Sequence, residues 1–321
     1  MEDSASTNAS TAVSARRMQD LRDELIERIA RIASVDGVIE PLPGVHLARV
    51  SRPLEPLHVV YCTALCLVAQ GAKEVGIGQA IYRYDPGHYL LSMMALPAVS
   101  RVLDATRERP YLSLRVDLDA ALVGALMAEA GMSAPMGRSV VKAVGISSLD
   151  PDLLDACVRL VRLAETPAAA AVLAPMVKRE IVFRLLLGDQ GDRLRRLPAL
   201  AGHTQSIGKA LSVLRTEFDR PLRMEAVAAQ AGMSASAFYQ HFRAITDMSP
   251  LQFQKQLRLQ HARRLMLGEG LDAATAAYRV GYSDASHFSR EYRRYFREPP
   301  ARDVRRLRNG EKMRPADPKL I

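Results

Sequence analysis

The spacing of apolar side chains changes character along the 321 residues of the chain. Residues 18–34 carry apolar side chains at helical intervals, which predicts an amphipathic helix. Residues 45–117 instead carry short apolar runs broken by Pro and Gly, which favours a small antiparallel barrel or sandwich. The seven runs are VHLARVS, HVVYCTALCLVAQ, KEVGIG, QAIYRYD, HYLLSMM, SRVLDAT and YLSLRVD.

Helical spacing returns at Leu118, and three further segments follow before residue 189. The first ends at Gly131, the second covers residues 150–166 with Pro151 suited to its first turn, and the third covers residues 167–188. We therefore expect helices to flank the barrel. The second segment has an apolar stripe made of Leu153, Leu154, Cys157, Leu160, Val161 and Ala164.

Residues 227–243 and 276–294 share one pattern, so the chain carries the same device twice. Ala228 lies four residues before Gly232, and Ala277 lies four residues before Gly281, 49 residues further on. The small alanine lets two helices approach closely, and glycine permits the left-handed backbone that ends a helix in a tight turn.

Each glycine is followed by a helix cap and by aromatic residues at matching intervals. Ser234 precedes Phe238 by four residues, and Asp284 precedes Phe288 by four residues. A Ser or Asp side chain at such a position accepts hydrogen bonds from the first free N–H groups of a helix. With a second aromatic four residues later, the pattern predicts two helix-turn-helix units. These second aromatics are Phe242 and Tyr292.

Polar side chains opposite the aromatic stripes are candidate DNA contacts. Short polar residues allow a close approach to DNA, and Gln and Arg can bind base edges through two hydrogen bonds. A helical hairpin with a merely solvated basic face is the common alternative, but two matched copies favour DNA binding. The candidates are Ser236, Tyr239, Gln240 and Arg243 in the first copy and Ser286, His287, Arg290 and Arg294 in the second.

The segment between the copies predicts a connecting helix. Ser249 is a suitable cap, Pro250 suits the first turn, and Gly268 or Gly270 is expected to end the helix. About eighteen residues would span roughly 27 Å, near the ~34 Å that separates successive major-groove faces of a duplex.

Charge is divided unevenly along the chain. Residues 189–321 hold 24 Lys and Arg against 14 Asp and Glu, whereas residues 1–188 hold 20 against 21. The C-terminal part is therefore expected to bind a polyanion, and the N-terminal part is not.

Cysteine usage and hydropathy favour a cytoplasmic protein with no membrane partner. Cys62, Cys66 and Cys157 form no C-x-x-C pair, so we interpret them as small buried hydrophobes in a reducing compartment. The apolar runs are much shorter than the ~20 residues that a membrane helix needs.

The C-terminal motifs resemble the AraC/XylS family of bacterial transcription regulators. The resemblance rests on MSPLQFQKQLRLQHARRLM and GYSDASHFSREYRRYFREPP, within residues 205–308, and departs from the family only where REPP lacks a glycine before the proline. LCLVAQGAKEVGIGQAIYRYDPGHYLLS and PYLSLRVDLD also resemble the regulatory domain of one subgroup of that family. The resemblance implies a cupin-like β-barrel with dimerisation helices, and as partners promoter DNA, a small-molecule effector, RNA polymerase and a second copy of the chain.

Two enzyme classes are the alternatives. A cupin-type metal enzyme with a basic accessory domain would need an H-x-H pair, which the seven histidines do not form, and His88 is better explained as a strand-end surface residue. A DNA-repair methyltransferase would need a reactive Cys beside Pro and His, a setting that the three cysteines lack. We therefore expect no catalysis, no metal and no cofactor.

These observations predict an α+β fold, in which a cupin-like barrel with flanking helices precedes an all-α domain of two helix-turn-helix units joined by a linker helix. The apolar stripe of residues 153–161 is compatible with packing inside its own domain and with a dimer contact. The expected division is a disordered tail at residues 1–17, a regulatory domain at 18–188, a linker at 189–203, a DNA-binding domain at 204–310, and a tail at 311–321.

Overall fold

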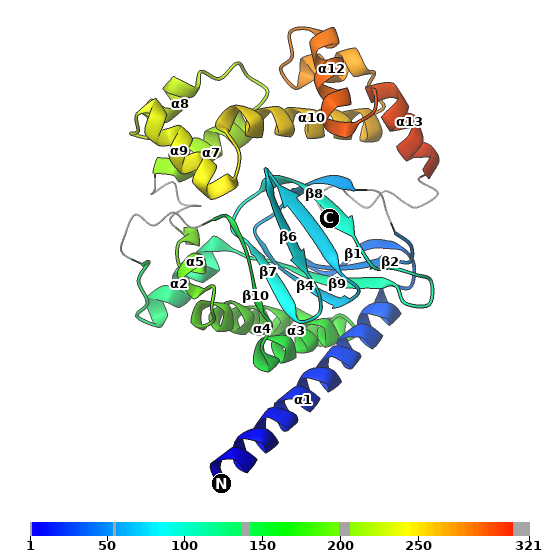
Figure 1. Cartoon of the computed structure of the whole chain (residues 1–321), viewed down its shortest axis with the longest axis vertical. Coiled ribbons are helices and arrows are strands. Elements are labelled where there is room, and N and C mark those ends of the chain that lie inside the picture. Colours follow the sequence, from blue (N-terminus) through cyan, green and yellow to red (C-terminus); the bar gives the residue numbers. More distant parts are fainter. Residues whose placement is uncertain (1, 54–55, 136–141, 199–205, 311–321) are drawn as a thin grey trace.

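The computed structural model describes residues 2–53, 56–135, 142–198 and 206–310. It consists of a two-sheet barrel with helices packed beneath it and a helical C-terminal part above it (Figure 1). The predicted fold class is confirmed, because antiparallel strands with flanking helices make up the N-terminal part and the described residues of the C-terminal part form helices without strands.

Two antiparallel sheets form the barrel. The first has six strands in the order β1-β2-β9-β4-β7-β10, and the second has four in the order β3-β8-β5-β6. In chain order the strands are β1 (Gly37–Leu42), β2 (Val45–Val50), β3 (Leu57–Tyr61), β4 (Ala64–Gln70), β5 (Lys73–Ile77), β6 (Ala80–Tyr84), β7 (His88–Ser92), β8 (Leu96–Val102), β9 (Tyr111–Asp117) and β10 (Val144–Ser148).

Period-two alternation places the two faces of the first sheet in different cores. On β4, Leu65 and Leu67 pack against helices, whereas Cys66 and Val68 point toward the second sheet. Both faces are therefore covered, which explains why this strand is a continuous apolar run rather than an alternating one.

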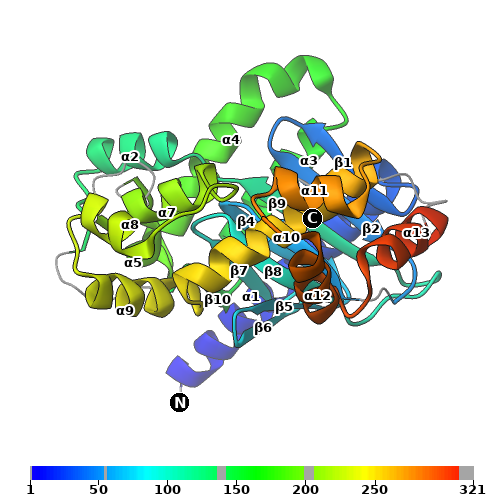
Figure 2. The ribbon, with the colours of Figure 1, turned by 90° about the horizontal axis from the view of Figure 1, so that it is seen from above.

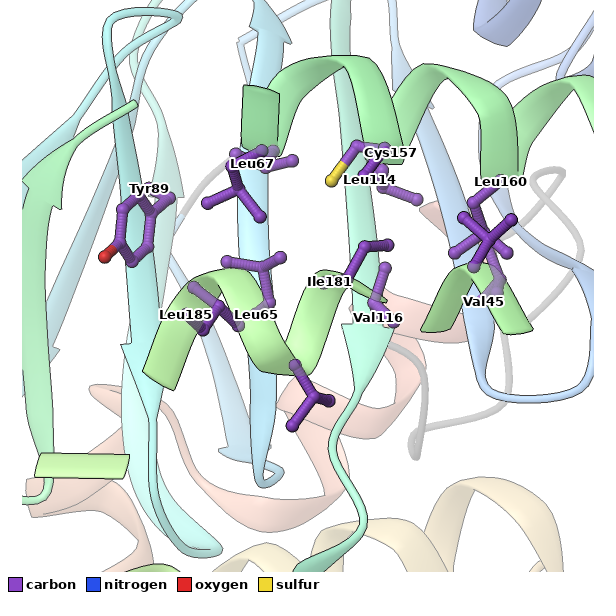
Figure 3. Packing of buried hydrophobic residues seen from close by; sticks show 14 of the residues in the cluster. Val45, Leu65, Leu67, Tyr89, Leu114, Val116, Cys157, Leu160, Ile181 and Leu185 are labelled. Carbon is purple, nitrogen blue, oxygen red and sulfur yellow. The ribbon is translucent and has the colours of Figure 1, made fainter. Parts of the chain in front are cut away.

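Helices α1, α3 and α4 cover the outer face of the first sheet. Asp150 caps α3 by accepting hydrogen bonds from the N–H groups of Asp152 and Leu153. Cys157 and Leu160 of α3 and Ile181 of α4 meet the strand side chains in one apolar layer (Figure 3). The flanking helices are α1 (Glu2–Ile32), α2 (Ala120–Glu129), α3 (Pro151–Leu163), α4 (Pro167–Leu187) and the short α5 (Gly191–Leu194).

This packing decides between the two interpretations of the α3 stripe. Leu153, Leu154, Cys157, Leu160 and Val161 are each at most 1% exposed. Since they lie against the sheet of their own chain, they cannot form a dimer contact, and the stripe packs inside its own domain.

The strand prediction was incomplete in three respects. The run of residues 58–70 turns at Cys62 and Thr63 and so contributes two strands, β3 and β4. Strand β1 was missed, because its six residues include a Pro and a Glu, and β10 was missed, because it is a five-residue segment without an apolar run.

Helix α1 begins at Glu2, so the structure continues the expected helix of residues 18–34 back through the segment for which disorder was predicted. The tail at 311–321 and residues 199–203 of the expected linker lie outside the described residues. The division of the chain into domains stays a prediction.

The C-terminal part contains the two predicted units. The first unit is α8 (Met224–Gln230) with α9 (Ala235–Thr246), and the second is α11 (Ala273–Arg279) with α12 (Ala285–Phe296). The linker helix α10 (Pro250–Gly268) joins them. Helix α7 (Ser206–Thr216) precedes the first unit, and α13 (Pro300–Gly310) follows the second.

The C-terminal part packs on the barrel at two places. Gln260 of α10 donates a hydrogen bond from Nε2 to the carbonyl oxygen of Val59, on the edge strand β3, at 3.1 Å. The N–H of Ala143 donates to the carbonyl oxygen of Ile245, near the end of α9, at 2.8 Å. Apolar residues of the second sheet and of the first unit accordingly belong to one core.

Candidate nucleic-acid interface

The two turns have the same backbone geometry. Gly232 and Gly281 have φ angles of 67° and 88°, in the left-handed region that the spacing predicted. The N–H of the residue after each glycine donates to the carbonyl oxygen of the matching alanine, at 2.9 Å from Met233 to Ala228 and 3.0 Å from Tyr282 to Ala277. This bond closes the C-terminal end of the first helix in both units.

The predicted caps begin the second helices. The Ser234 side chain accepts a hydrogen bond from the N–H of Ala237 at 3.2 Å, and Asp284 Oδ1 accepts from the N–H of Ser286 at 2.7 Å. Both cap residues have extended backbone. The caps fix where α9 and α12 start, and hence which side chains face outward.

Aromatic side chains anchor both second helices. Phe238, Phe242, Phe288 and Tyr292 have no exposed surface. The rings contact one another within each helix, at 5.6 Å between the centroids of Phe238 and Phe242 and 5.4 Å between those of Phe288 and Tyr292. The helices can therefore turn only one polar face to solvent.

That polar face carries the predicted contact residues. In the described structure neither Arg290 nor Arg294 forms an ion pair or a side-chain hydrogen bond, and the same holds for Gln240 and Arg243. Tyr239 is half-buried, with its ring 6.0 Å from that of Phe238, on the flank of the helix. The residues with exposed side chains are Ser236, Gln240, Arg243, Ser286, His287, Arg290 and Arg294.

Among the candidates with exposed side chains, His287 contacts residues of its own unit. Its Nε2 lies 3.5 Å from Glu291 Oε1, and its ring centroid lies 5.8 Å from that of Tyr282. Glu291 also pairs with Lys255 of α10 and accepts a hydrogen bond from the Tyr282 hydroxyl at 2.8 Å. These contacts hold the start of α12 against the linker helix.

One exposed arginine of α12 was not among the predicted residues. Arg293 lies beside Arg294 in the last turn of α12. The sequence signal was present, because at about 100° per residue Arg293 lies about 140° from Phe288 around the helix and Arg294 about 120°, so the argument from position that selected Arg294 applies to Arg293 as well.

The second unit is fixed to its surroundings by a buried carboxylate. Asp303 of α13 has no exposed surface and forms ion pairs with Arg263 of α10 and with Arg306, at 2.8 Å each. The Tyr292 hydroxyl donates to Asp303 Oδ2 at 2.7 Å. Burial and the charge of Asp303 raise the pKa of Tyr292, so the phenol remains a hydrogen-bond donor.

Linker helix α10 sets the separation of the two units. Its 19 residues correspond to about 28 Å of helix. Helix α9 adjoins the start of α10, whereas α12 lies toward its other end (Figure 2). This length is near the ~34 Å between successive major-groove faces on one side of DNA.

Comparisons with known proteins agree with this architecture. Residues 41–193 match the protein family described as AraC-type transcriptional regulator N-terminus. Residues 227–306 match a helix-turn-helix domain family. The chain belongs to the AraC family of transcription regulators, with an N-terminal regulatory domain and a C-terminal helix-turn-helix domain.

Curated relatives match the chain in part. The HTH-type transcriptional activator RhaS of Salmonella agona (strain SL483) is 33% identical over 156 residues, which cover 47% of this chain and 54% of RhaS. RhaS of Salmonella schwarzengrund (strain CVM19633) is 30% identical over 155 residues, with the same coverage. The chain thus spans about half the length of the curated relatives it matches.

A solved structure is similar over a longer region. Unsaturated fatty acid-bound ToxT from Vibrio cholerae strain SCE256 covers 81% of this chain and 94% of its own, with a TM-score of 0.48 and 8% sequence identity.

Proposed function

We propose that this protein binds promoter DNA sequence-specifically through α9 and α12, the recognition helices, and regulates transcription there. The observation that carries the proposal is the pair of matched units, each with an exposed polar helix face, that α10 joins. RNA polymerase is a further proposed partner, because a regulator bound at a promoter lies beside the polymerase. The site of action is then the cytoplasm, where bacterial DNA lies.

The exposed residues suit different parts of a duplex. Gln240 and Arg290 occupy equivalent places, each two residues after a buried phenylalanine. Glutamine pairs well with adenine and arginine with guanine in the major groove. Arg294, one turn further along α12, is placed to contact phosphate, which positions the helix without selecting sequence.

Salt dependence tests DNA binding. The excess positive charge of residues 189–321 predicts that affinity for duplex DNA falls steeply as salt rises, because phosphate contacts release counterions. Fluorescence anisotropy of the full chain should show this slope, and Arg294→Ala should lower it by about one. Affinity that does not change with salt would contradict the proposal.

An enzymatic role has little support in the described residues. They contain no group of three or more His, Cys, Asp or Glu placed to hold a metal ion. Metal analysis of the purified protein tests the alternative of a cupin-type metal enzyme.

Among the described residues, no helix is long and apolar enough to cross a membrane.

A small-molecule effector is the second proposed partner, and strand β3 offers a route from the barrel to the recognition helices. Tyr61 of β3 points between the two sheets, and two residues earlier the Val59 carbonyl accepts the hydrogen bond from Gln260 of α10. A change in the barrel that moves β3 would therefore move the linker helix.

A homodimer is the third proposed partner, and we assign its contact to α4. Val172, Met176, Phe183 and Leu187 are between 36% and 68% exposed. At 100° per residue they lie within an arc of about 60°, which makes one apolar stripe on the outer side of this helix. An exposed stripe of this kind is typical of an interaction site.

Light scattering tests the dimer. Met176→Asp should convert a dimer to a monomer, whereas Arg101→Asp, an exposed position on the far sheet, should not. A wild-type protein that is monomeric at micromolar concentrations would contradict this assignment.

A further inference from the structure

Glu291 places a negative charge on α12, one of the two helices proposed to bind DNA. At about 100° per residue it lies about 60° from the buried Phe288 and about 100° from the exposed Arg290, at the border between the buried face and the polar face. A carboxylate in this place repels DNA phosphates, which carry the same sign of charge. The charge of Glu291 thus opposes DNA binding, so any contribution to recognition must come from its contacts within the protein.

Three side chains surround the Glu291 carboxylate. Lys255 of α10 forms an ion pair with Oε1, and the Tyr282 hydroxyl donates a hydrogen bond to Oε2 at 2.8 Å. His287, one turn earlier on α12, has its Nε2 3.5 Å from Oε1. Burial and the hydrogen bond with Glu291 raise the pKa of Tyr282, so the phenol remains a donor. Both carboxylate oxygens are therefore engaged, and the Glu291 side chain is 17% exposed.

Tyr282 and Glu291 together hold the His287 ring. The centroid of this ring lies 5.8 Å from that of Tyr282, with the two planes at 63°, which is an edge-to-face contact. Tyr282 is itself buried, and the guanidinium carbon of Arg258 lies 5.8 Å from its ring centroid. His287 therefore has a rigid aromatic neighbour on one side and a carboxylate at Nε2, while its side chain remains 53% exposed.

The first unit lacks this pair of residues. Counted from the buried phenylalanine of each unit, Ala237 stands where the second unit has His287, and His241 stands where it has Glu291. His241 is exposed, and alanine has no polar side-chain group to orient. Any contribution of the pair to recognition is therefore confined to the part of a DNA site that α12 contacts.

We infer that Glu291 is a positioning residue for DNA recognition, which orients the His287 imidazole toward a base in the part of the DNA site that α12 contacts. This inference rests on the proposed function and assigns to it a determinant of specificity. A ring already held by Tyr282 and Glu291 loses less conformational freedom on binding than a long side chain without such contacts. The ion pair with Lys255 offsets the repulsion between Glu291 and the phosphates.

Glu291→Gln tests the inference on the full chain, because it removes the charge and keeps the shape of the side chain. The readouts are selection of preferred sites from random duplex DNA and affinity for an unrelated duplex. Affinity for the unrelated duplex should rise about twofold, because one repelling charge is lost. The base preference in the part bound by α12 should fall about fivefold, the order expected for one hydrogen bond, and the part bound by α9 should keep its preference. A variant that only loses stability would instead bind both kinds of DNA less tightly.

Glu269→Gln is the matched control. It removes a carboxylate at the end of α10 whose ion pair with Arg279 is exposed, and it should leave the base preference of both parts of the site unchanged. If Glu291→Gln also leaves the preference unchanged, or if the two variants change it alike, the inference is wrong.

A double-mutant cycle tests whether Glu291 acts through His287. Because the His287 side chain is exposed, His287→Ala should leave the core intact and lose the same base preference as Glu291→Gln. In the His287→Ala background, Glu291→Gln should cause no further loss. Losses that add would show that the two residues act independently. An equal loss of affinity for all sequences in His287→Ala would show a phosphate contact, and either result would overturn the inference.

The wild-type profile separates this inference from the proposed function. If the wild type selects no preferred site, the proposed function is contradicted and the inference falls with it. If the wild type selects a site that Glu291→Gln selects with the same profile, the inference alone is contradicted.

Discussion

The backbone of Gly281 lies against the backbone of Asp219, so that a β-carbon added to Gly281 would come 1.7 Å from the Asp219 carbonyl oxygen. Asp219 lies in the loop before the first unit, and Gly281 lies in the turn of the second. The loop before the first unit therefore touches the turn of the second unit at a position that only glycine can occupy.

Gly281→Ala should destabilise the protein far more than Gly232→Ala. Both positions have left-handed backbone, which costs an alanine roughly 1–2 kcal/mol. At Gly232 an added β-carbon meets nothing within 4 Å, whereas at Gly281 it would collide with backbone. We expect a loss of more than about 3 kcal/mol for Gly281→Ala in chemical denaturation. Equal losses for the two variants would show that the contact with Asp219 is not maintained in solution.

Arg258 joins the loop before the first unit to the turn of the second, and it should determine the spacing of the two units on DNA. From α10 it donates to the carbonyl oxygens of Phe218 at 2.6 Å, Arg220 at 2.7 Å and Gly281 at 2.9 Å. The DNA site of this protein is expected to have two patches of bases, one for α9 and one for α12. Arg258→Met should lower affinity for such a site about tenfold, and it should tolerate an inserted base pair between the two patches better than the wild type does.

Arg279→Met is the matched control for Arg258. Arg279 forms an exposed pair with Glu269 at 2.6 Å, of a kind that contributes little to stability. If both variants respond alike to the inserted base pair, Arg258 does not set the spacing.

Acid should weaken the contact between the barrel and the second unit through His58. Its ring lies 4.5 Å from that of Tyr295 and 4.7 Å from that of Phe296, and burial, assisted by Arg263, lowers its pKa from 6.5 to about 4. As the pH falls from 6.5 to 4, the unfolded histidine binds a proton that the folded one does not. The free energy of unfolding should therefore fall by up to about 1.4 kcal/mol for each unit by which the pH is lowered, as the contribution of His58 alone.

His58→Phe isolates this contribution. Burial also lowers the pKa of His261 to about 4, so the variant should keep the part of the pH slope that His261 contributes and lose the part that His58 contributes. Urea denaturation between pH 4 and 7 measures it. An unchanged slope would show that His58 is not buried neutral at this contact.

The sequence predicted the local features of the two units because those depend on short-range chemistry. Left-handed glycines, caps such as Ser234, and aromatic anchors such as Phe238 are each determined within a few residues. Contacts between distant segments were not predictable in this way. Neither the bond from Gln260 to Val59, 201 residues away, nor the contact of Gly281 with Asp219 has a local signature.

The base preferences of the recognition helices test the account's central claim most directly. Gln240 of α9 and Arg290 of α12 are exposed and equivalent, and a good two-bond base contact contributes roughly 1–3 kcal/mol of discrimination. The measurement is selection of preferred sites from random duplex DNA by the wild type, Gln240→Ala and Arg290→Ala. We predict that Gln240→Ala relaxes the preference in one patch and that Arg290→Ala relaxes it in another, about one helical turn or ~10 base pairs away. If either variant lowers affinity uniformly and leaves the base profile unchanged, that residue positions the helix on the phosphate backbone, and sequence recognition by two equivalent helices is contradicted.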